Sequence, residues 1–304
     1  MNHDWITNEL IVEYAKCICI MFESQIENRY NVIEPYFKFA IFLLTSNTYD
    51  ISTILEELFE FIDYVLLIAS GKNFKHIAET LEGKRLGNLL VDFTYNNSDL
   101  LQLYAIDCIT YISSYKEEDN LKIFDHASLL SCIKDHLGSN KTNLRNCALM
   151  IFTNLIISSS KASHMLLNDR EVVNSIIMTF YSNLDDESLL ITLQAIRNLL
   201  SVVDENIFWF FIKNISFIDS LIELLINSKI PGILNTMRMV FKFLFILGDH
   251  DIFYSNEILD NPFTKYIREN DKQLEAFLSI QYHDNSFVRK SYSELIKEYL
   301  IRHK

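Results

Sequence analysis

The chain has 304 residues, of which 49% are hydrophobic and 22% charged, and it contains only 6 Gly and 3 Pro. This composition predicts a non-fibrous, almost purely helical protein whose turns depend on Asn, Ser and Asp instead of Gly and Pro. The net charge of −13 argues against a general nucleic-acid binder, which must neutralise phosphates with Lys and Arg.

The location of the protein can be inferred from its apolar stretches and its cysteines. No stretch approaches the roughly 20 apolar residues that a membrane span needs, and residues 1–5 lack the basic start of a leader sequence. The cysteines form an odd set scattered over predicted helices, which favours reduced thiols over a disulfide framework. They are Cys17, Cys19, Cys108, Cys132 and Cys147. We therefore expect a soluble cytoplasmic protein without membrane insertion, with the nucleus as the alternative location.

The N-terminal segment is predicted to form long amphipathic helices. Over residues 54–64, acidic residues alternate with an apolar stripe, as on a helix with one buried face. This segment departs from the repeat that follows it. We expect residues 1–71 to form an atypical helical cap that closes the apolar end of the first regular repeat.

Four nine-residue segments then recur at almost constant spacing. They begin at Tyr104, Cys147, Ile191 and Thr236, so the intervals are 43, 44 and 45 residues. Self-similarity at about 40 to 47 residues is typical of stacked units of two or three helices, which bury a core only against their neighbours. The repeat therefore predicts an all-α protein, with each recurring segment forming the long last helix of one unit.

A second apolar pattern keeps the same spacing. It begins at Leu86, Leu129, Val172 and Phe217, and within each copy the apolar residues follow in steps of four, which places them on one helical face. A shorter apolar pair also recurs. Its three copies are Ile123-Phe124, Leu166-Leu167 and Phe211-Ile212. Each unit is thus predicted to contain a short helix, a middle helix and a last helix.

The last helices resemble those of the armadillo and HEAT class, and the armadillo member more closely. The resemblance rests on residues 147–155 and 195–199, which contain a small residue followed by the Asn-Leu pairs at Asn154 and Asn198. It implies a right-handed α-solenoid of armadillo-like three-helix repeats. We expect one solenoid over 1–304, with regular repeats over 72–248 and an irregular C-terminal repeat and cap over 249–304. The polar turn of Asp249, His250 and Asp251 is expected to provide a helix N-cap, with an ion-binding turn as the alternative.

In peptide-binding armadillo proteins, the asparagine of this pair lies on the concave groove and holds the backbone of an extended ligand. Tyr111 and Phe243 stand at the equivalent positions of the other two units. The tryptophan that such proteins carry four residues earlier is also absent. The residues in its place are Asp107, Met150, Gln194 and Met239. A nuclear-import type of peptide reader is therefore not expected.

The resemblance implies a non-catalytic scaffold or adaptor that binds a partner protein on the concave surface. The predicted contacts are Asp107, Tyr111, Met150, Asn154, Gln194, Arg197, Asn198, Met239, Lys242 and Phe243. In size and acidity, the chain is also similar to two groups of armadillo-like proteins. One is the nucleotide exchange factors of seventy-kilodalton heat-shock chaperones, and the other is scaffolds that regulate kinases. A helical-repeat enzyme acting on nucleic acid is the less favoured alternative.

No motif for catalysis or for a cofactor emerges. The chain contains no Gly-rich phosphate loop, no Gly-x-Ser-x-Gly and no His-Glu-x-x-His. Cys132 and His136 are one helical turn apart, with His126 nearby, but a second Cys/His pair at zinc spacing is missing. We expect no enzyme activity, no metal and no cofactor.

An aromatic segment at 207–212 coincides with the short helix of one unit. A helix that is apolar on all sides is either buried throughout or available to a partner. One interpretation is that Phe208 and Trp209 pack under an adjacent loop. The alternative is a contact patch of Phe208, Trp209 and Phe210 that anchors another protein or a second copy of this chain.

Overall fold

A computed structural model describes residues 30–45, 54–68, 84–115, 123–158, 160–182, 184–202, 205–254 and 261–301, with isolated positions at 10, 13, 14, 17 and 52. Every regular element in these ranges is a helix, so the predicted all-α class is confirmed. The chain divides into two compact units, unit 1 over Met1–Ala162 and unit 2 over Ser163–Lys304.

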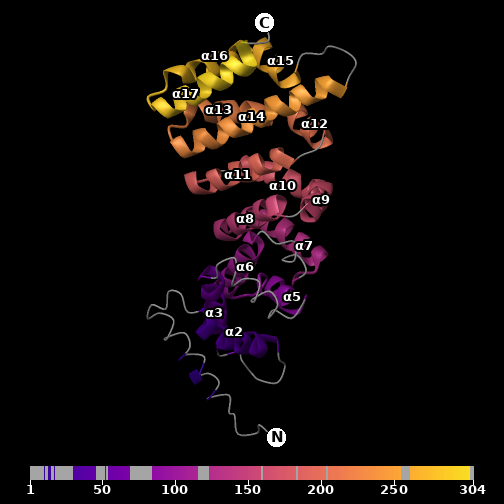
Figure 1. Cartoon of the computed structure of the whole chain (residues 1–304), viewed down its shortest axis with the longest axis vertical. Coiled ribbons are helices and arrows are strands. Elements are labelled where there is room, and N and C mark those ends of the chain that lie inside the picture. The colour runs from indigo at the N-terminus through magenta and orange to yellow at the C-terminus, as the bar shows by residue number, and fades with distance from the viewer. Residues whose placement is uncertain are drawn as a thin grey trace. The chain divides into compact units, whose positions relative to one another are not determined.

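Unit 1 is built on a row of three long helices that pack side by side. Helix α3 packs against α6, and α6 packs against α8 (Figure 1). Helices α2 and α5 pack at the start of this row, and α7 packs against α8. The bounds are α2 Tyr30–Thr45, α3 Leu55–Ile68, α5 Lys84–Phe93, α6 Asp99–Ser114, α7 His126–Leu137 and α8 Thr142–Ser158. Helix α9 (Ser160–Asn168) crosses the boundary between the units.

Unit 2 repeats this pattern around α11 and α14, which pack along each other, and α17 packs on the other side of α14. Helices α10, α12 and α13 contact these long helices, and α15 and α16 contact one another and their neighbours. The bounds are α10 Arg170–Phe180, α11 Asp186–Val202, α12 Glu205–Lys213, α13 Ile215–Asn227, α14 Pro231–Tyr254, α15 Pro262–Glu269, α16 Asp271–Ser279 and α17 Ser286–Leu295. A 3-10 turn (Ile280–Tyr282) precedes α17, and a π-helical turn (Ile296–Ile301) follows it.

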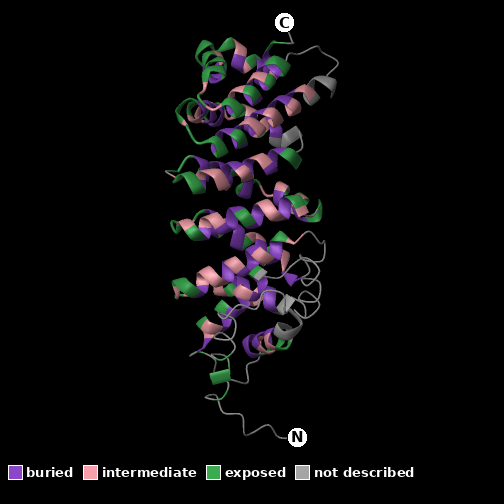
Figure 2. Cartoon of the chain, turned by 60° about the vertical axis from the view of Figure 1, so that its left-hand side comes forward, coloured by how far each residue is buried: buried purple, intermediate pink, exposed green. Residues whose placement is uncertain are grey.

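The predicted repeat corresponds to these helices. The recurring segments at Tyr104, Cys147, Ile191 and Thr236 lie in α6, α8, α11 and α14. The second apolar pattern lies in α5, α7, α10 and α13. Figure 2 shows buried and exposed residues on the same helices, as expected where each helix buries one stripe against its neighbours.

Polar side chains begin these helices, as the low content of Gly and Pro predicts. Ser98 caps α6, Asp125 caps α7, Asp169 caps α10 and Asn214 caps α13, each accepting a hydrogen bond from a backbone N–H of the first turn. Such a cap satisfies backbone donors that have no partner inside the helix. The turns are therefore defined by side-chain oxygens and not by backbone flexibility.

The core of unit 2 is aromatic around α14. The rings of Phe241 and Phe277 lie 4.8 Å apart between centroids, as do those of Phe245 and Phe263, and Tyr299 stacks on Phe245 at 4.9 Å. Edge and offset contacts of this kind add to the free energy of simple burial. This cluster joins α14 to α15, α16 and the C-terminal turn.

One boundary in unit 2 differs from the sequence-based expectation. Asp249 does not begin a helix, because α14 continues through it to Tyr254. The N-cap is Asn261, which begins α15, accepts hydrogen bonds from the amides of Phe263 and Thr264, and donates to Oδ1 of Asp249 over 2.6 Å. The predicted N-cap role of Asp249 is therefore wrong, and the predicted division of the chain at residues 71 and 248 stays a prediction.

Within the described residues, one segment, Pro231–Asp249 of α14, has the length and apolar composition of a helix that could cross a membrane. Half of that segment is buried inside unit 2. Core helices meet the same two criteria, so length and composition alone do not identify a membrane span.

Candidate functional site

The helices α3, α6 and α8 present one polar face, which we call the unit 1 face. It consists of Glu60, Asp63 and Leu67 on α3, Tyr104, Asp107 and Tyr111 on α6, and Met150 and Asn154 on α8. On each helix these residues are three or four positions apart and therefore share one side. The other sides of the same helices carry fully buried residues such as Ile62, Ile109 and Phe152.

Residues at equivalent positions form rows across this face. Asp63, Asp107 and Met150 follow at intervals of 44 and 43 residues, and Leu67, Tyr111 and Asn154 follow at the same intervals. Since α3 packs against α6 as α6 packs against α8, the row of last helices begins at α3. Asp63 is absent from the contacts predicted from the sequence, because residues 1–71 were expected to form a cap. The 44-residue interval from Asp107 was the available signal.

The carboxyl group of Asp63 lies in an unfavourable environment for a charge. Burial raises the pKa of Asp63 to about 7, and the nearby carboxylates of Asp107 and Glu60 add to the rise. Its Oδ1 atom is enclosed and has no hydrogen-bond partner. In the described part of the chain, no basic side chain forms an ion pair with Asp63 or Asp107.

Asp107 is half-buried beside Asp63, and among the described side chains one donates a hydrogen bond to it. The thiol of Cys147 donates to Oδ1 of Asp107 over 3.1 Å. Burial raises the pKa of Asp107, and this hydrogen bond partly opposes the rise. Burial together with the charges of Asp63 and Asp107 raises the pKa of Tyr111 to about 12, so its phenol remains neutral at physiological pH. The centre of the face is therefore anionic and flanked by neutral aromatic rings.

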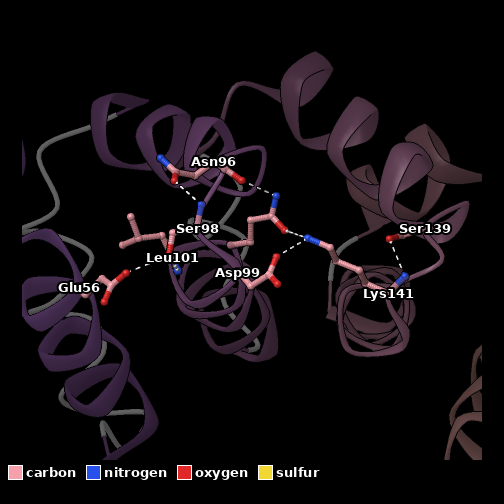
Figure 3. A network of polar contacts seen from close by, with 8 residues as sticks. Glu56, Asn96, Ser98, Asp99, Leu101, Ser139 and Lys141 are labelled. Carbon is pink, nitrogen blue, oxygen red and sulfur yellow. Dashed lines mark hydrogen bonds and ion pairs between the residues drawn. The ribbon is translucent and has the colours of Figure 1, made fainter.

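A polar network, shown in Figure 3, ties the N-terminal ends of these helices together. Ser98 donates its hydroxyl to Oε1 of Glu56 over 2.9 Å, joining α6 to α3. Lys141, directly before α8, donates from Nζ to Oδ1 of Asp99 over 2.6 Å and to Oε1 of Gln102 over 2.6 Å, joining α8 to α6. The three helices are thus held in register beside the face.

The two predicted contacts on α8 have different roles. The amide of Asn154 donates to the carbonyl oxygen of Thr110 over 3.3 Å and to Oγ of Ser113 over 3.2 Å, so it ties α8 to α6. Met150 is 42% exposed and has an apolar surface to offer. The donors of Asn154 are already used inside unit 1, whereas Met150 is available to a ligand.

Unit 2 carries the other predicted contacts on α11 and α14. Gln194, Met239, Lys242 and Phe243 are half-buried there. The guanidinium of Arg197 donates to Oδ1 of Asn198 from Nε over 3.0 Å and from a terminal nitrogen over 2.9 Å. Asn198 itself is only 5% exposed, so it positions Arg197 and offers little surface to a ligand.

The aromatic segment of α12 divides between core and surface. Phe208 is 1% exposed and belongs to the core of the repeat, so it is not part of a surface patch. Trp209 is half-buried, with Nζ of Lys213 lying 5.6 Å from its ring centroid. Phe210 is 40% exposed. The predicted patch is therefore reduced to Trp209 and Phe210, and their role stays a prediction.

The two residues considered as metal ligands are held in packing contacts. Sγ of Cys132 lies 3.6 Å from Oγ1 of Thr94, and the ring of His136 stacks on Tyr95 with 5.2 Å between centroids. Cys108, Cys132 and Cys147 are buried free thiols and Cys17 is an exposed one, while Cys19 lies outside the described residues. The described residues include no group of three metal-ligating side chains.

No protein-family model matches this sequence, and no curated protein matches it. Solved structures of designed proteins do match its fold. A designed armadillo repeat protein in complex with the peptide (KR)4 has a TM-score of 0.65 at 15% identity, over 86% of this chain and 99% of that chain. Computationally designed armadillo repeat proteins for modular peptide recognition give a TM-score of 0.63 at 15% identity, over 86% and 99%.

A third structure, an engineered protein, has a TM-score of 0.66 at 16% identity and covers 97% of this chain and 76% of its own. Identities this low bear on the fold and not on the ligand. The order of short, middle and last helices in α9–α11 and again in α12–α14 agrees with the same architecture. The chain therefore has the all-α, armadillo-like repeat fold that its 43- to 45-residue spacing predicts.

Proposed function

We propose that this chain is a non-catalytic, protein-binding repeat scaffold whose unit 1 face holds a basic, extended segment of a partner protein. The observation that carries the proposal is the pair of half-buried carboxyl groups at Asp63 and Asp107, which have no basic partner among the described residues. A buried charge without a partner is costly, and an opposite charge within about 4–6 Å favours the ionised form.

The neighbouring side chains suit the same ligand. Tyr104 and Tyr111 flank Asp107 on α6, and neutral aromatic rings attract Lys and Arg through their faces. Glu60 adds a carboxylate on α3, and Met150 adds exposed apolar surface for the methylene groups of such side chains. Charge, aromatic rings and apolar surface thus favour one class of ligand.

Two further points support the proposal. Rows that repeat every 43 or 44 residues offer similar contacts at regular intervals, which suits a segment bound in extended form. In addition, the designed armadillo repeat protein of similar fold was solved with a peptide of alternating Lys and Arg. The contacts predicted on α11 and α14 of unit 2 extend the proposal and stay predictions.

The proposal is tested with fluorescence anisotropy on three labelled eight-residue peptides: alternating Lys-Arg, the same length of Glu, and Gly-Ser. We expect the basic peptide to bind and the other two to remain free. The double substitution Asp63→Asn and Asp107→Asn should weaken binding at least tenfold, since a charge-assisted contact is worth about 1.5–3 kcal/mol.

The matched control is Asp92→Asn, which removes an exposed carboxylate of α5 away from the unit 1 face. It should leave the affinity within about twofold of the unmodified protein. Equal binding of the acidic and basic peptides, or an unchanged affinity in the double variant, would refute the proposal.

A further inference from the structure

Asp63 and Asp107 stand at equivalent positions on two helices that pack directly against each other. Neighbouring packed helices have axes about 8–10 Å apart, and the charge of Asp107 reaches Asp63 across this contact. Both residues are half-buried. Oδ1 of Asp63 is enclosed without a partner, while Oδ1 of Asp107 accepts the thiol of Cys147. The pair therefore has one enclosed oxygen that lacks a donor.

Among the described residues, every ionisable group that acts on this pair is acidic or neutral. On α3, the neighbouring group is Glu60, whose charge acts on Asp63. On α6 and α8, burial together with the charge of Asp63 raises the pKa of four neutral groups, which are Tyr104, Cys108, Tyr111 and Cys147. Helix α2 also packs against α3, but its described ionisable side chains, Tyr36 and Lys38, are not among the groups that act on Asp63. No described neighbour supplies the missing positive charge.

Two nearby carboxyl groups in a poorly solvated site do not ionise independently. The second charge must form against both burial and the first charge, so the pair keeps one proton to a higher pH than a single exposed carboxyl. A proton also supplies the donor that the enclosed oxygen lacks. Such a group changes its charge when a cation arrives, since the cation replaces the proton.

We propose that Asp63 and Asp107 share one proton at neutral pH and release it to solvent when the cationic group of a basic segment binds, so that pH regulates the unit 1 face. This inference rests on the proposed function for its ligand, whereas the shared proton itself is a property of the free protein. Lys and Arg stay charged well above neutral pH, so the titration belongs to the scaffold and not to the ligand.

The expected size of the effect follows from the titration. Burial and Asp107 raise the pKa of Asp63 to about 7, so the fraction of the pair in the fully ionised form grows about tenfold between pH 6 and pH 8. If only that form accepts the cation, the Kd for a basic peptide should fall about tenfold over the same range.

The first experiment needs no ligand. The carboxyl carbons of Asp63 and Asp107 are followed by ¹³C NMR from pH 3 to pH 9 in the full chain, with Asp107→Asn and Asp92→Asn as variants. We expect the pair to titrate in two steps, one near neutral pH, and Asp107→Asn to leave a single step for Asp63 at lower pH. Asp92→Asn should leave both steps in place. Two ordinary acidic titrations near pH 4 would overturn the inference.

The second experiment measures the Kd of the alternating Lys-Arg octapeptide at pH 6, 7 and 8, together with proton release by calorimetry in two buffers of different ionisation enthalpy. The unmodified protein should bind about tenfold more tightly at pH 8 and release a proton at pH 6. Asp63→Asn should bind more weakly and lose this pH dependence, whereas Asp92→Asn should keep it.

The two experiments distinguish a failure of the proposed function from a failure of the proposed pH regulation. If the carboxyl pair titrates near neutral pH but no basic peptide binds, the proposed function is wrong and the proton-release step falls with it, while the shared proton is established. If the peptide binds with equal affinity at pH 6 and pH 8 and releases no proton, the regulation is wrong and the scaffold function stands.

Discussion

The thiol of Cys147 on α8 donates to Oδ1 of Asp107 on α6 over 3.1 Å. Burial, the charge of Asp107 and this hydrogen bond together raise the pKa of Cys147 well above its usual value. Since the thiolate is the reactive form, this cysteine acts as a structural donor and is a poor nucleophile.

We predict that Cys147 reacts with iodoacetamide at pH 8 at least about tenfold more slowly than the exposed Cys17 of the same molecule, because its thiolate is rare and enclosed. Peptide mapping by mass spectrometry over a time course gives both rates in one sample. Cys147→Ala should also raise the pKa of Asp107, since the lost hydrogen bond favoured the charged carboxylate, whereas Cys147→Ser keeps a donor. Comparable labelling of the two cysteines would contradict this assignment.

The aromatic segment of α12 gives a second prediction, because Phe208 is buried and Phe210 is not. Phe208→Ala should lower the free energy of unfolding by about 3–5 kcal/mol, the usual result for a Phe removed from a packed core. Phe210→Ser should change it by less than about 0.5 kcal/mol. Chemical denaturation followed by circular dichroism measures both. A large loss in the Phe210 variant would mean that this ring is part of the core.

Two helical glycines leave room for a neighbouring segment to approach closely. A Cβ atom at Gly87 would overlap the carbonyl oxygen of Ile123, and one at Gly248 would overlap the side chain of Asn261. Gly87→Ala should therefore destabilise unit 1 by at least about 2 kcal/mol, since a backbone atom cannot move aside without shifting the chain. Gly248→Ala should destabilise unit 2 through the displaced Asn261.

The control for these two variants is Gly232→Ala, because a Cβ atom there meets nothing closer than a Leu190 methyl group at 4.0 Å. Thermal unfolding should show an unchanged or slightly higher Tm for this control, as alanine is the better helix former. If Gly87→Ala melts at the same temperature as the control, the close approach of α5 to Ile123 is not as described.

The burial of His136 predicts that the folded protein loses stability in acid. The residue is 6% exposed, and Nε2 is enclosed without a partner. Burial lowers the pKa of His136, with the charge of Asp135 opposing and that of Lys141 adding to the effect. In the unfolded chain, His136 therefore binds a proton near pH 6.5, whereas in the folded protein it stays neutral to a lower pH. The free energy of unfolding falls as the pH drops below about 6.5.

His136→Phe should remove that dependence, since phenylalanine still stacks on Tyr95 but does not titrate. The measurement is the free energy of unfolding from urea titrations between pH 5 and pH 8, compared between the variant and the unmodified protein. The difference between the two curves should change below about pH 6.5 and stay constant above it. Parallel curves over the whole range would show that His136 titrates normally.

Much of the fold could be predicted because the core residues recur. Apolar residues at matching positions of four last helices, such as Ile109 and Phe152, identify a buried stripe without reference to any structure. The same comparison identified Asp107 and Tyr111 as departures from the pattern, and both lie on the unit 1 face. Residues that repeat reveal the scaffold, and residues that break the repeat point to its surface.

The remainder of the site depends on tertiary contacts that a single sequence does not contain. Asn154 looks like a ligand-binding asparagine, yet its amide donates to Thr110 and Ser113 on α6. From the sequence, Asp63 looks like a solvated acid on an amphipathic helix. In the structure it is half-buried on α3, which packs against α6. In both cases the neighbour is about 40 residues away in the chain, and the environment it creates decides whether a polar group is free, bonded or buried.

The hydrogen bonds between Ser98 and Glu56 and between Lys141 and Asp99 each join residues that are 42 positions apart. An apolar stripe alone tolerates a slip of one helical turn, because residues three or four positions along present nearly the same face. These polar bridges lose both partners in such a slip, so they discriminate between the correct alignment of neighbouring repeats and its near copies. Exposed side chains at the helix ends thus favour the correct assembly of unit 1. They contribute little to the total stability, but they select one alignment from several of similar hydrophobic content.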